Sequence, residues 1–230
     1  MGASISIIIP TLNEAEAIGR TLDSAAGAGI ERIVADGGSA DATAAIALAR
    51  GAAVVTAPRG RASQMNAGAC VARGETLLFL HADTLLPPQF GAEVQRTLDL
   101  PGVVAGAFSL RIDGSGARLR WVERLANWRS RVLQLPYGDQ GFFLRAELFR
   151  ALGGFPEMPL LEDLEMARRA RRRGRITLSP LAALTSARRW ESVGILRATL
   201  LNQVFLLAYL LGMPPRKIAQ WYYREGQGRS

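Results

Sequence analysis

The sequence predicts an α/β protein with a mostly parallel central sheet flanked by helices and followed by a helical tail. Two observations support this prediction. Over the first hundred residues, apolar runs of strand length alternate with helix-length amphipathic segments, the order that right-handed βα crossovers require. Residues 77–84, LLFLHADT, begin with an unbroken apolar run, which is typical of a strand buried on both faces of a parallel sheet.

Four strands and three helices are expected in the first half of the chain. Each predicted strand is an apolar run that stops at a proline or a polar loop; these strands cover residues 4–9, 30–35, 52–56 and 77–84. The helices between them carry apolar side chains at three- and four-residue spacing; they cover a segment from about 14 to 27, residues 42–50 and residues 62–73.

The second half of the chain is less periodic. Strands are expected over residues 103–112 and 142–144, and helices over 118–133, 146–152 and 161–173. A polar, glycine-rich loop, PYGDQG, precedes the shorter strand.

The tail contains a strongly apolar segment, residues 195–211, that is interrupted by Arg197, Asn202 and Gln203. Without about 18 uninterrupted apolar residues, a membrane-spanning helix is not expected. The segment can lie in a membrane interface, pack against the body or bind a second subunit, and these alternatives stay open. With no leader sequence evident either, a cytoplasmic location is expected, with the inner face of the membrane as one place of contact.

Composition limits the class of protein. With 230 residues, 49% of them hydrophobic, one domain with a full core is expected. The single cysteine, Cys70, excludes an internal disulfide, and its apolar neighbours favour a small core residue. The net charge of +8 comes almost entirely from arginine, which favours anionic partners, although genomic base composition can also produce it. The basic residues are not interleaved with aromatic ones in any recognisable module, so nucleic-acid binding is not expected.

Acidic residues stand at the ends of three predicted elements: Asp36, Asp83 and the pair Glu162 and Asp163. Ligands bind at the carboxyl edge of open α/β sheets, so Asp83 is well placed to hold a hard divalent cation. The alternative is that Asp83 caps a turn and that the pair complements a helix dipole. The first βα turn, PTLNE, lacks the dinucleotide-binding glycines, and a Walker lysine loop is also absent. NAD binding and P-loop ATP hydrolysis are therefore not expected.

The chain resembles the inverting family 2 glycosyltransferases with the GT-A nucleotide-diphospho-sugar transferase fold. Five segments, in the family's order, carry the resemblance: SIIIPTLNE (6–14), ADGGSADAT (35–43), GRASQMNAGACVARGE (60–75), LLFLHADT (77–84) and LEDLEMARRARRRG (161–174). Two further segments, GDQGFFLR and TSARRW, are similar to a small bacterial sub-branch assigned to arsenosugar or carotenoid glycosylation.

The resemblance implies one domain with a nucleotide-sugar-binding half (1–100), an acceptor half (101–190) and a helical tail (191–230). The donor would be a UDP- or GDP-linked sugar and the cation Mg²⁺ or Mn²⁺. Asp83 matches the last position of the family's D-x-D metal motif, in which His81 replaces the first acid; His81 is either a ligand or a strand-end histidine. The residues implied in nucleotide-sugar binding are Pro10, Thr11, Glu14, Asp36, Arg61, Asn66 and Ala82.

Asp163 matches the family's general base, which would activate a hydroxyl of a small-molecule or lipid acceptor. A single displacement from the face opposite the leaving group inverts the anomeric carbon, and a hard cation stabilises the departing diphosphate. Ser186 replaces the glutamine of the Q-x-x-R-W signature of processive synthases, so non-processive transfer is expected. The acceptor-side candidates are Asp139, Glu162, Arg189 and Trp190.

Two other classes of protein remain as alternatives: a nucleotidyltransferase, for which PTLNE is a poor substitute for a glycine-rich basic loop, and a non-catalytic nucleotide-sugar or lipid-binding protein. Six arginines between residues 168 and 175 form either a solvated helix face or a contact for anionic lipid or a phosphate-bearing acceptor. The donor base, the sugar, the acceptor and the oligomeric state, including a homodimer, stay open.

Overall fold

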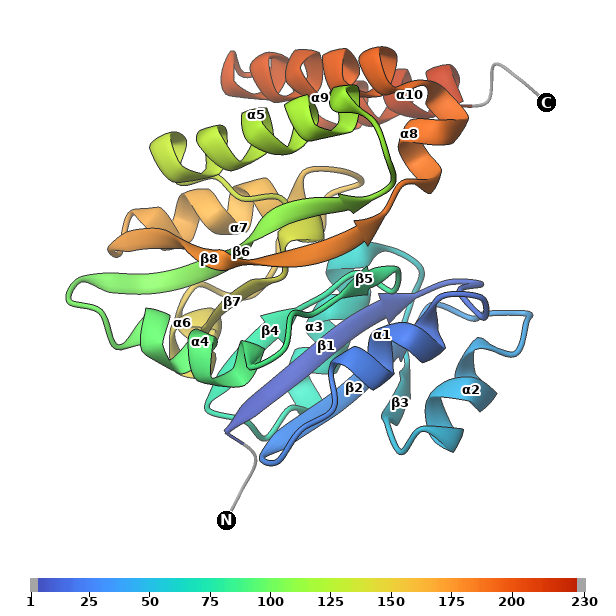
Figure 1. The fold of residues 1–230 in the computed structure, drawn as a ribbon, viewed down its shortest axis with the longest axis vertical. Coiled ribbons are helices and arrows are strands. Elements are labelled where there is room, and N and C mark those ends of the chain that lie inside the picture. The colour runs from blue at the N-terminus through green and yellow to red at the C-terminus, as the bar shows by residue number, and fades with distance from the viewer. Residues whose placement is uncertain (1–3, 227–230) are drawn as a thin grey trace.

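An eight-stranded sheet in the order β3-β2-β1-β4-β7-β6-β8-β5 runs through the molecule (Figure 1). The computed structural model describes residues 4–226, without the side chains of residues 189, 192, 193, 196, 198, 210 and 222–226. The strands are β1 (Ile5–Thr11), β2 (Ile30–Asp36), β3 (Ala53–Thr56), β4 (Thr76–Phe79), β5 (Thr84–Leu85), β6 (Val103–Asp113), β7 (Phe142–Arg145) and β8 (Arg175–Ser186).

Most neighbouring strands run in the same direction. β3, β2, β1 and β4 pair in parallel, as do β6 and β8, whereas β7 and β5 run antiparallel to their neighbours. The predicted α/β class with a mostly parallel sheet is therefore confirmed.

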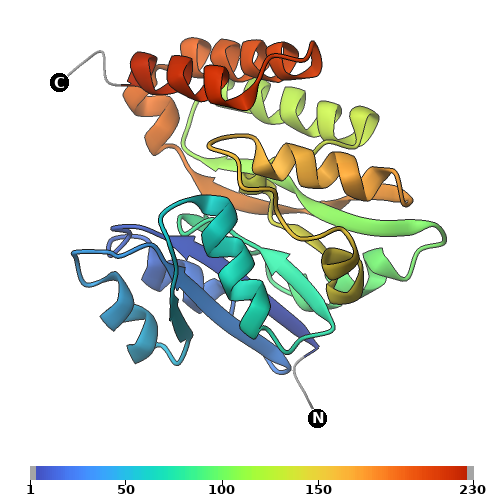
Figure 2. The same cartoon turned by 180° about the vertical axis from the view of Figure 1, so that it is seen from behind.

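Helices cover both faces of the sheet and form a further layer at one end of the molecule (Figures 1 and 2). The helices against the sheet are α1 (Ile18–Ser24), α2 (Thr43–Ala49), α3 (Arg61–Val71), α4 (Phe90–Leu98), α6 (Ala146–Ala151) and α7 (Glu162–Arg171). The end layer consists of α5 (Ala117–Leu133), α8 (Arg188–Val193), α9 (Ile195–Leu210) and α10 (Pro215–Gly226). A short 3₁₀ turn, η1 (Gly138–Gln140), precedes β7.

The side chains of β1 show how the two faces of the sheet become two cores. Ile8 packs with residues of α3, α6 and α7, whereas Ile7 and Ile9 pack with residues of α1, α2 and α4 on the other face. All three are fully buried and β-branched, as suits a strand covered on both sides. A smaller cluster, which includes Leu119 and Trp190, joins β6 to α5 and α8.

The run LLFLHADT does not form one strand as predicted. β4 ends at Phe79, and Thr84 and Leu85 instead pair with β8, which lies on the far side of β6 and β7 in the sheet. Residues 80–83 cross between the two positions as a loop, so the predicted strand 77–84 was too long. The loop carries His81 and Asp83 at the carboxyl edge of the sheet.

Strand β8 and helix α4 were not anticipated from the sequence. The burial of β8 does not alternate regularly, and its pairing with β6 shifts register twice, between Val103 and Ala105 and between Ala107 and Ser109. Because a bulged strand breaks the two-residue period, periodicity could not reveal it.

Cys70 is an exposed free thiol on α3, so its predicted core position was wrong. The buried side of α3 is formed by Ala62, Met65 and Ala69, at three- and four-residue spacing, and Cys70 falls outside this stripe.

Among the residues that the structure describes, no helix combines the length and apolarity needed to cross a bilayer. Helix α9 buries Phe205 and Leu206 and exposes Leu200 and Leu207. One side of α9 therefore packs against the body, which was one of the three alternatives for the tail.

Candidate active site

A cavity of about 510 Å³ lies at the carboxyl edge of the sheet. Its wall is built from the end of β1, the start of α3, the loop after β4, η1, the start of α7, the end of β8 and helices α8 and α9. The predicted site residues that line it are Pro10, Thr11, Glu14, Arg61, Ala82, Asp83, Asp139, Glu162, Asp163 and Trp190. The fold therefore brings the predicted donor, metal, base and acceptor candidates to one place.

Asp36 does not line the cavity but supports its wall. At the end of β2 its carboxylate accepts hydrogen bonds from the N–H groups of Gly38 (3.0 Å) and Ser39 (2.9 Å) and from the Thr11 hydroxyl (3.2 Å). Burial raises the pKa of Asp36, but the hydrogen bonds from Ser39, Gly38 and Thr11 outweigh it and lower the pKa below its ordinary value. The ionised carboxylate thus holds the loop beside Thr11.

Asn66 is not among the residues that line the cavity. The side-chain amide of Asn66 donates to the carbonyl of Phe155 (2.8 Å), and its oxygen accepts the Phe155 N–H (2.9 Å). Asn66 therefore ties α3 to the segment after α6. The side chain of Arg189 lies outside the described residues.

Arg188 joins two carboxylates of the cavity wall. Its Nη2 lies 2.8 Å from Oε2 of Glu14 and 3.2 Å from Oδ2 of Asp83. Sequence reasoning missed Arg188, because in SARRW only the second arginine was singled out. The structure shows that the first one meets the predicted metal ligand.

The carboxylates of Asp83 and Glu14 fit a hard divalent cation. Mg²⁺ typically binds proteins through one or two carboxylates together with substrate phosphates. Over the described part of the chain, no group of three or more His, Cys, Asp or Glu side chains could hold a metal ion. A cation at Asp83 therefore needs additional oxygen ligands, which the diphosphate of a nucleotide would provide.

Asp163 is held in one orientation at the start of α7. Its Oδ2 accepts the N–H of Gly138 (2.7 Å) and its Oδ1 accepts the N–H of Leu164 (2.7 Å). A Cβ atom at Gly138 would lie 2.6 Å from Nε2 of His81 and 3.3 Å from Oδ2 of Asp163. Only glycine therefore lets the η1 backbone approach both side chains.

Glu162 is buried beside Asp163, with 4% of its surface exposed. Burial raises the pKa of Glu162 to about 7; the negative charge of Asp163 adds to this effect and the Arg61 guanidinium opposes it. Leu161, just before the pair, has a φ of +68°, a conformation that non-glycine residues seldom adopt. Such strain collects at functional sites, and here it precedes the two acids.

Gln64 also lines the cavity and was not predicted. Its side-chain amide donates to the carbonyls of Thr11 (2.7 Å) and Ala35 (2.8 Å), which ties the ends of β1 and β2 together. Helical spacing could have indicated Gln64, because it lies one turn after the predicted residue Arg61 on the same side of α3.

The fold and the position of the cavity define a GT-A-type α/β protein. The model of Glycosyl transferase family 2 matches residues 6–153. The chain belongs to glycosyl transferase family 2. Uncharacterized glycosyltransferases of Mycobacterium bovis and Mycobacterium tuberculosis are 32% identical over 148 residues, which cover 60% of this chain and 65% of each relative.

Solved structures show the same fold. A mannosyltransferase from Pyrobaculum calidifontis in complex with GDP-Man and Mn²⁺ superposes with a TM-score of 0.68 at 19% identity, over 99% of this chain and 71% of its own. Glucosyl-3-phosphoglycerate synthase from Mycobacterium tuberculosis, in complex with Mn²⁺, UDP and glucosyl-3-phosphoglycerate, gives a TM-score of 0.64 at 23% identity, over 93% and 81%. TarS from S. aureus in complex with UDP-GlcNAc gives 0.61 at 19% identity, over 81% and 58%.

Proposed function

We propose that this protein transfers a sugar from a nucleotide-diphosphate sugar to an acceptor hydroxyl, without processivity and with inversion of the anomeric carbon. The observation that carries the proposal is that Asp83 and Asp163, from different halves of a family 2 chain, line the same cavity. One carboxylate suits a cation beside the diphosphate, and the other suits proton transfer from the acceptor.

The donor would bind between the end of β1 and the start of α3. Pro10, Thr11 and Glu14 would surround the nucleotide, with Asp36 behind them, and Ala82 would contact it from the loop after β4. Arg61, at the positive end of the α3 dipole, suits the diphosphate. The UDP and GDP-Man complexes of the structural neighbours support this donor class.

Asp83 would hold Mg²⁺ or Mn²⁺, with Glu14 as a neighbouring carboxylate. Bound there, the cation would neutralise negative charge on the diphosphate as it departs. Mn²⁺ in two of the neighbouring structures supports a metal requirement.

Asp163 would remove the proton of the acceptor hydroxyl, since its carboxylate is held at the cavity wall by the Gly138 N–H. Asp139, Glu162, Trp190 and Arg189 remain the predicted acceptor contacts, and a small molecule or a lipid, including the arsenosugar or carotenoid type, remains the predicted acceptor. A cytoplasmic location is part of the proposal, because a reducing compartment suits the free thiol of Cys70.

Calorimetric titration with UDP, GDP and dTDP, with and without Mn²⁺, tests the donor site. One nucleotide is expected to bind in a metal-dependent way, and Asp83→Ala is expected to weaken that binding at least about tenfold. Asp113→Ala, which removes an exposed acid outside the cavity, is the matched control. If no nucleotide binds with or without metal, the donor site is wrong.

Slow hydrolysis of UDP-glucose or GDP-mannose, with water in place of the acceptor, tests the chemistry. Asp163→Asn should keep nucleotide affinity and lower the hydrolysis rate by about 10²–10⁴-fold. The product should first appear with inverted configuration by NMR. Release of pyrophosphate from a nucleoside triphosphate would indicate a nucleotidyltransferase instead, and binding without any turnover would favour a binding protein.

A further inference from the structure

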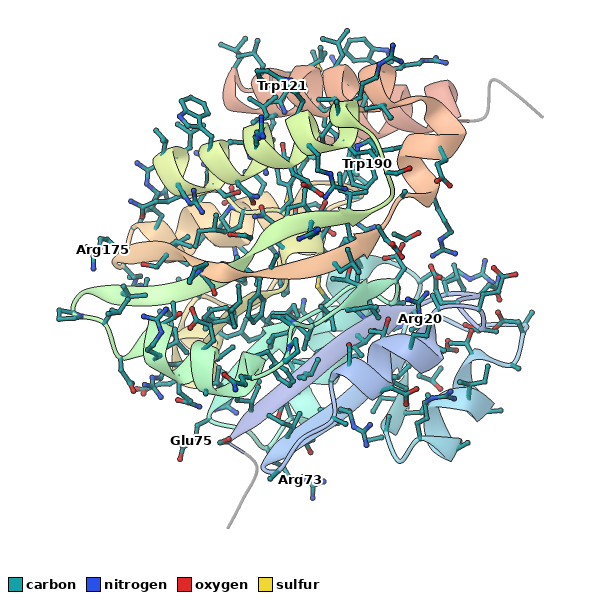
Figure 3. All side chains as sticks on the ribbon, in the orientation of Figure 1. Arg20, Arg73, Glu75, Trp121, Arg175 and Trp190 are labelled. Atoms are coloured by element: carbon teal, nitrogen blue, oxygen red, sulfur yellow. The ribbon has the colours of Figure 1, made fainter. Side chains whose placement is uncertain are left out.

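The outer side of α5 carries a stripe of large apolar side chains that the fold leaves uncovered. Trp121, Leu125, Trp128 and Val132 recur at three- and four-residue spacing, so they share one side of the helix. The two tryptophans are 69% and 58% exposed. Figure 3 shows Trp121, on α5, at the end of the molecule where α9 also lies.

Helix α9 packs beside α5 (Figure 1) and also exposes large apolar side chains. Leu200, Leu207 and Leu211 are 65%, 58% and 79% exposed, and their spacing puts them on the side opposite the buried Phe205 and Leu206. The outer apolar face is defined here as Trp121, Leu125, Trp128, Val132, Leu200, Leu207 and Leu211.

Positive charge borders the outer apolar face. Arg118, Arg124 and Arg131 are exposed on α5. The sequences of α5 and α9 contain one acid between them, Glu123, which is 9% exposed and paired with Arg120 at 2.8 Å.

The basic border continues onto α7. The Nη1 of Arg171 donates to the carbonyl of Leu133, the last residue of α5, at 2.9 Å. Arg171 therefore adds a positive charge at the end of α5, next to Val132 of the outer apolar face.

We propose that the outer apolar face docks on a bilayer with anionic headgroups. Tryptophan is enriched at membrane–water interfaces, and interfacial helices combine an apolar side with flanking basic residues. Each arginine near an anionic surface adds attraction. A second copy of this chain suits the face less well, because two arginine borders of the same sign would meet.

Docking has a geometric consequence for the cavity. Asn202 and Phe205 of α9 line the cavity, whereas Leu200 and Leu207 of the same helix belong to the outer apolar face. The cavity would then lie one helix away from the lipid surface. The docking proposal itself stands independently of the proposed transfer reaction, because it concerns binding alone.

Flotation with phosphatidylcholine vesicles, with and without phosphatidylglycerol, tests the proposal using the full chain. Binding is expected only with phosphatidylglycerol, and it should weaken as salt rises, since screening shortens the Debye length from about 10 Å at 0.1 M to about 3 Å at 1 M. The double variant Trp121→Ser, Trp128→Ser should lower the partition coefficient at least about tenfold. The pair Arg124→Gln, Arg131→Gln should lower it roughly 30-fold.

Two matched pairs serve as controls on the opposite half of the molecule. Leu48→Ser with Val71→Ser removes exposed apolar side chains of α2 and α3, and Arg20→Gln with Arg150→Gln removes exposed charges; both pairs should bind vesicles as the unmodified protein does. The proposal is overturned if phosphatidylglycerol vesicles are not bound, or if the test variants bind as well as the controls. It is also overturned if sedimentation shows a dimer that the tryptophan variant dissociates while vesicles leave it intact.

Discussion

Arg188 places a permanent positive charge between Asp83, the proposed metal ligand, and Glu14. Its contacts to Glu14 and Asp83, at 2.8 and 3.2 Å, join α8 to the loops that follow β1 and β4. A divalent cation that binds Asp83 must therefore compete with the Arg188 guanidinium for the Asp83 carboxylate.

Arg188→Ala should therefore tighten Mn²⁺ binding in the absence of nucleotide. The ion pairs are partly exposed, so the gain is expected to be about two- to fivefold, the equivalent of roughly 0.5–1 kcal/mol. Calorimetric titration with Mn²⁺ measures it, and the double variant Asp83→Ala, Arg188→Ala should show no such gain. Unchanged or weaker Mn²⁺ binding in Arg188→Ala would show that Arg188 does not compete with the cation for Asp83.

The raised pKa of Glu162, to about 7 from an ordinary 4.5, links stability to pH. Between these values the folded protein holds a proton that the unfolded chain has released, so the free energy of unfolding falls as pH rises from about 4.5 to about 7. Glu162→Gln removes this dependence and should be more stable than the unmodified protein at pH 8 by about 1–3 kcal/mol.

Urea unfolding at pH 5 and at pH 8 measures the effect of Glu162→Gln. Glu147→Gln, at an exposed position on α6, is the control and should leave the pH dependence unchanged. A Glu162→Gln variant that loses as much stability between these pH values as the unmodified protein would show that Glu162 does not carry the effect.

Two elements, η1 and the start of α7, form the acidic wall of the cavity together. The Gly138 N–H of η1 donates a hydrogen bond to Asp163 of α7. Leu161, with its positive φ, lies just before the two acids at the start of this helix. Movement of either element would therefore displace the proposed base.

Gly138→Ala should separate these elements. The added Cβ would lie 2.6 Å from Nε2 of His81, so we expect a loss of about 1–3 kcal/mol of stability and a lower donor hydrolysis rate. Gly91→Ala in α4 is the matched control: its Cβ would meet its nearest atoms at 3.8 Å, and alanine favours a helix over glycine by up to about 1 kcal/mol. Urea unfolding and hydrolysis assays compare the two. Equal behaviour of both variants would show that the close approach at Gly138 is unimportant.

Across the whole molecule, β7 joins the two halves into one folded body. It pairs antiparallel with β4 on one side and with β6 on the other. Phe143 of β7 is fully buried in the same core cluster as Ile7 and Ile9 of β1. The first half of the chain therefore completes its core with residues from the second half.

A fragment containing residues 1–101 should consequently fail to fold alone, whereas the full chain should unfold in one cooperative transition. Without β7, the edge of β4 and the space filled by Phe143 would be exposed. Near-UV circular dichroism and urea unfolding test both parts. A cooperative transition in the fragment would show that the two halves are separate folding units.

The elements that could be predicted from the sequence are those that depend on the pattern of neighbouring residues. The first three strands were found because their apolar runs and boundaries depend on neighbouring residues alone. β5 forms only because Thr84 and Leu85 meet Thr185 and Leu184, about a hundred residues further along the chain. No local period could reveal that pairing, and the same holds for the bulged β8.

The α/β class and the candidate acids Asp83 and Asp163 could be predicted from the sequence alone, because Asp83 follows a buried apolar run, Asp163 lies in the first turn of a predicted helix, and both lie in family motifs. The tertiary structure was needed to show that Arg188 pairs with Asp83 and that Gln64 lines the cavity. It was also needed to show that Asn66 forms hydrogen bonds with Phe155 and that Trp121 and Trp128 face outward. The physical reason is that the contacts and burial of these side chains depend on segments distant in the chain, whose positions are set by the packing of the whole molecule.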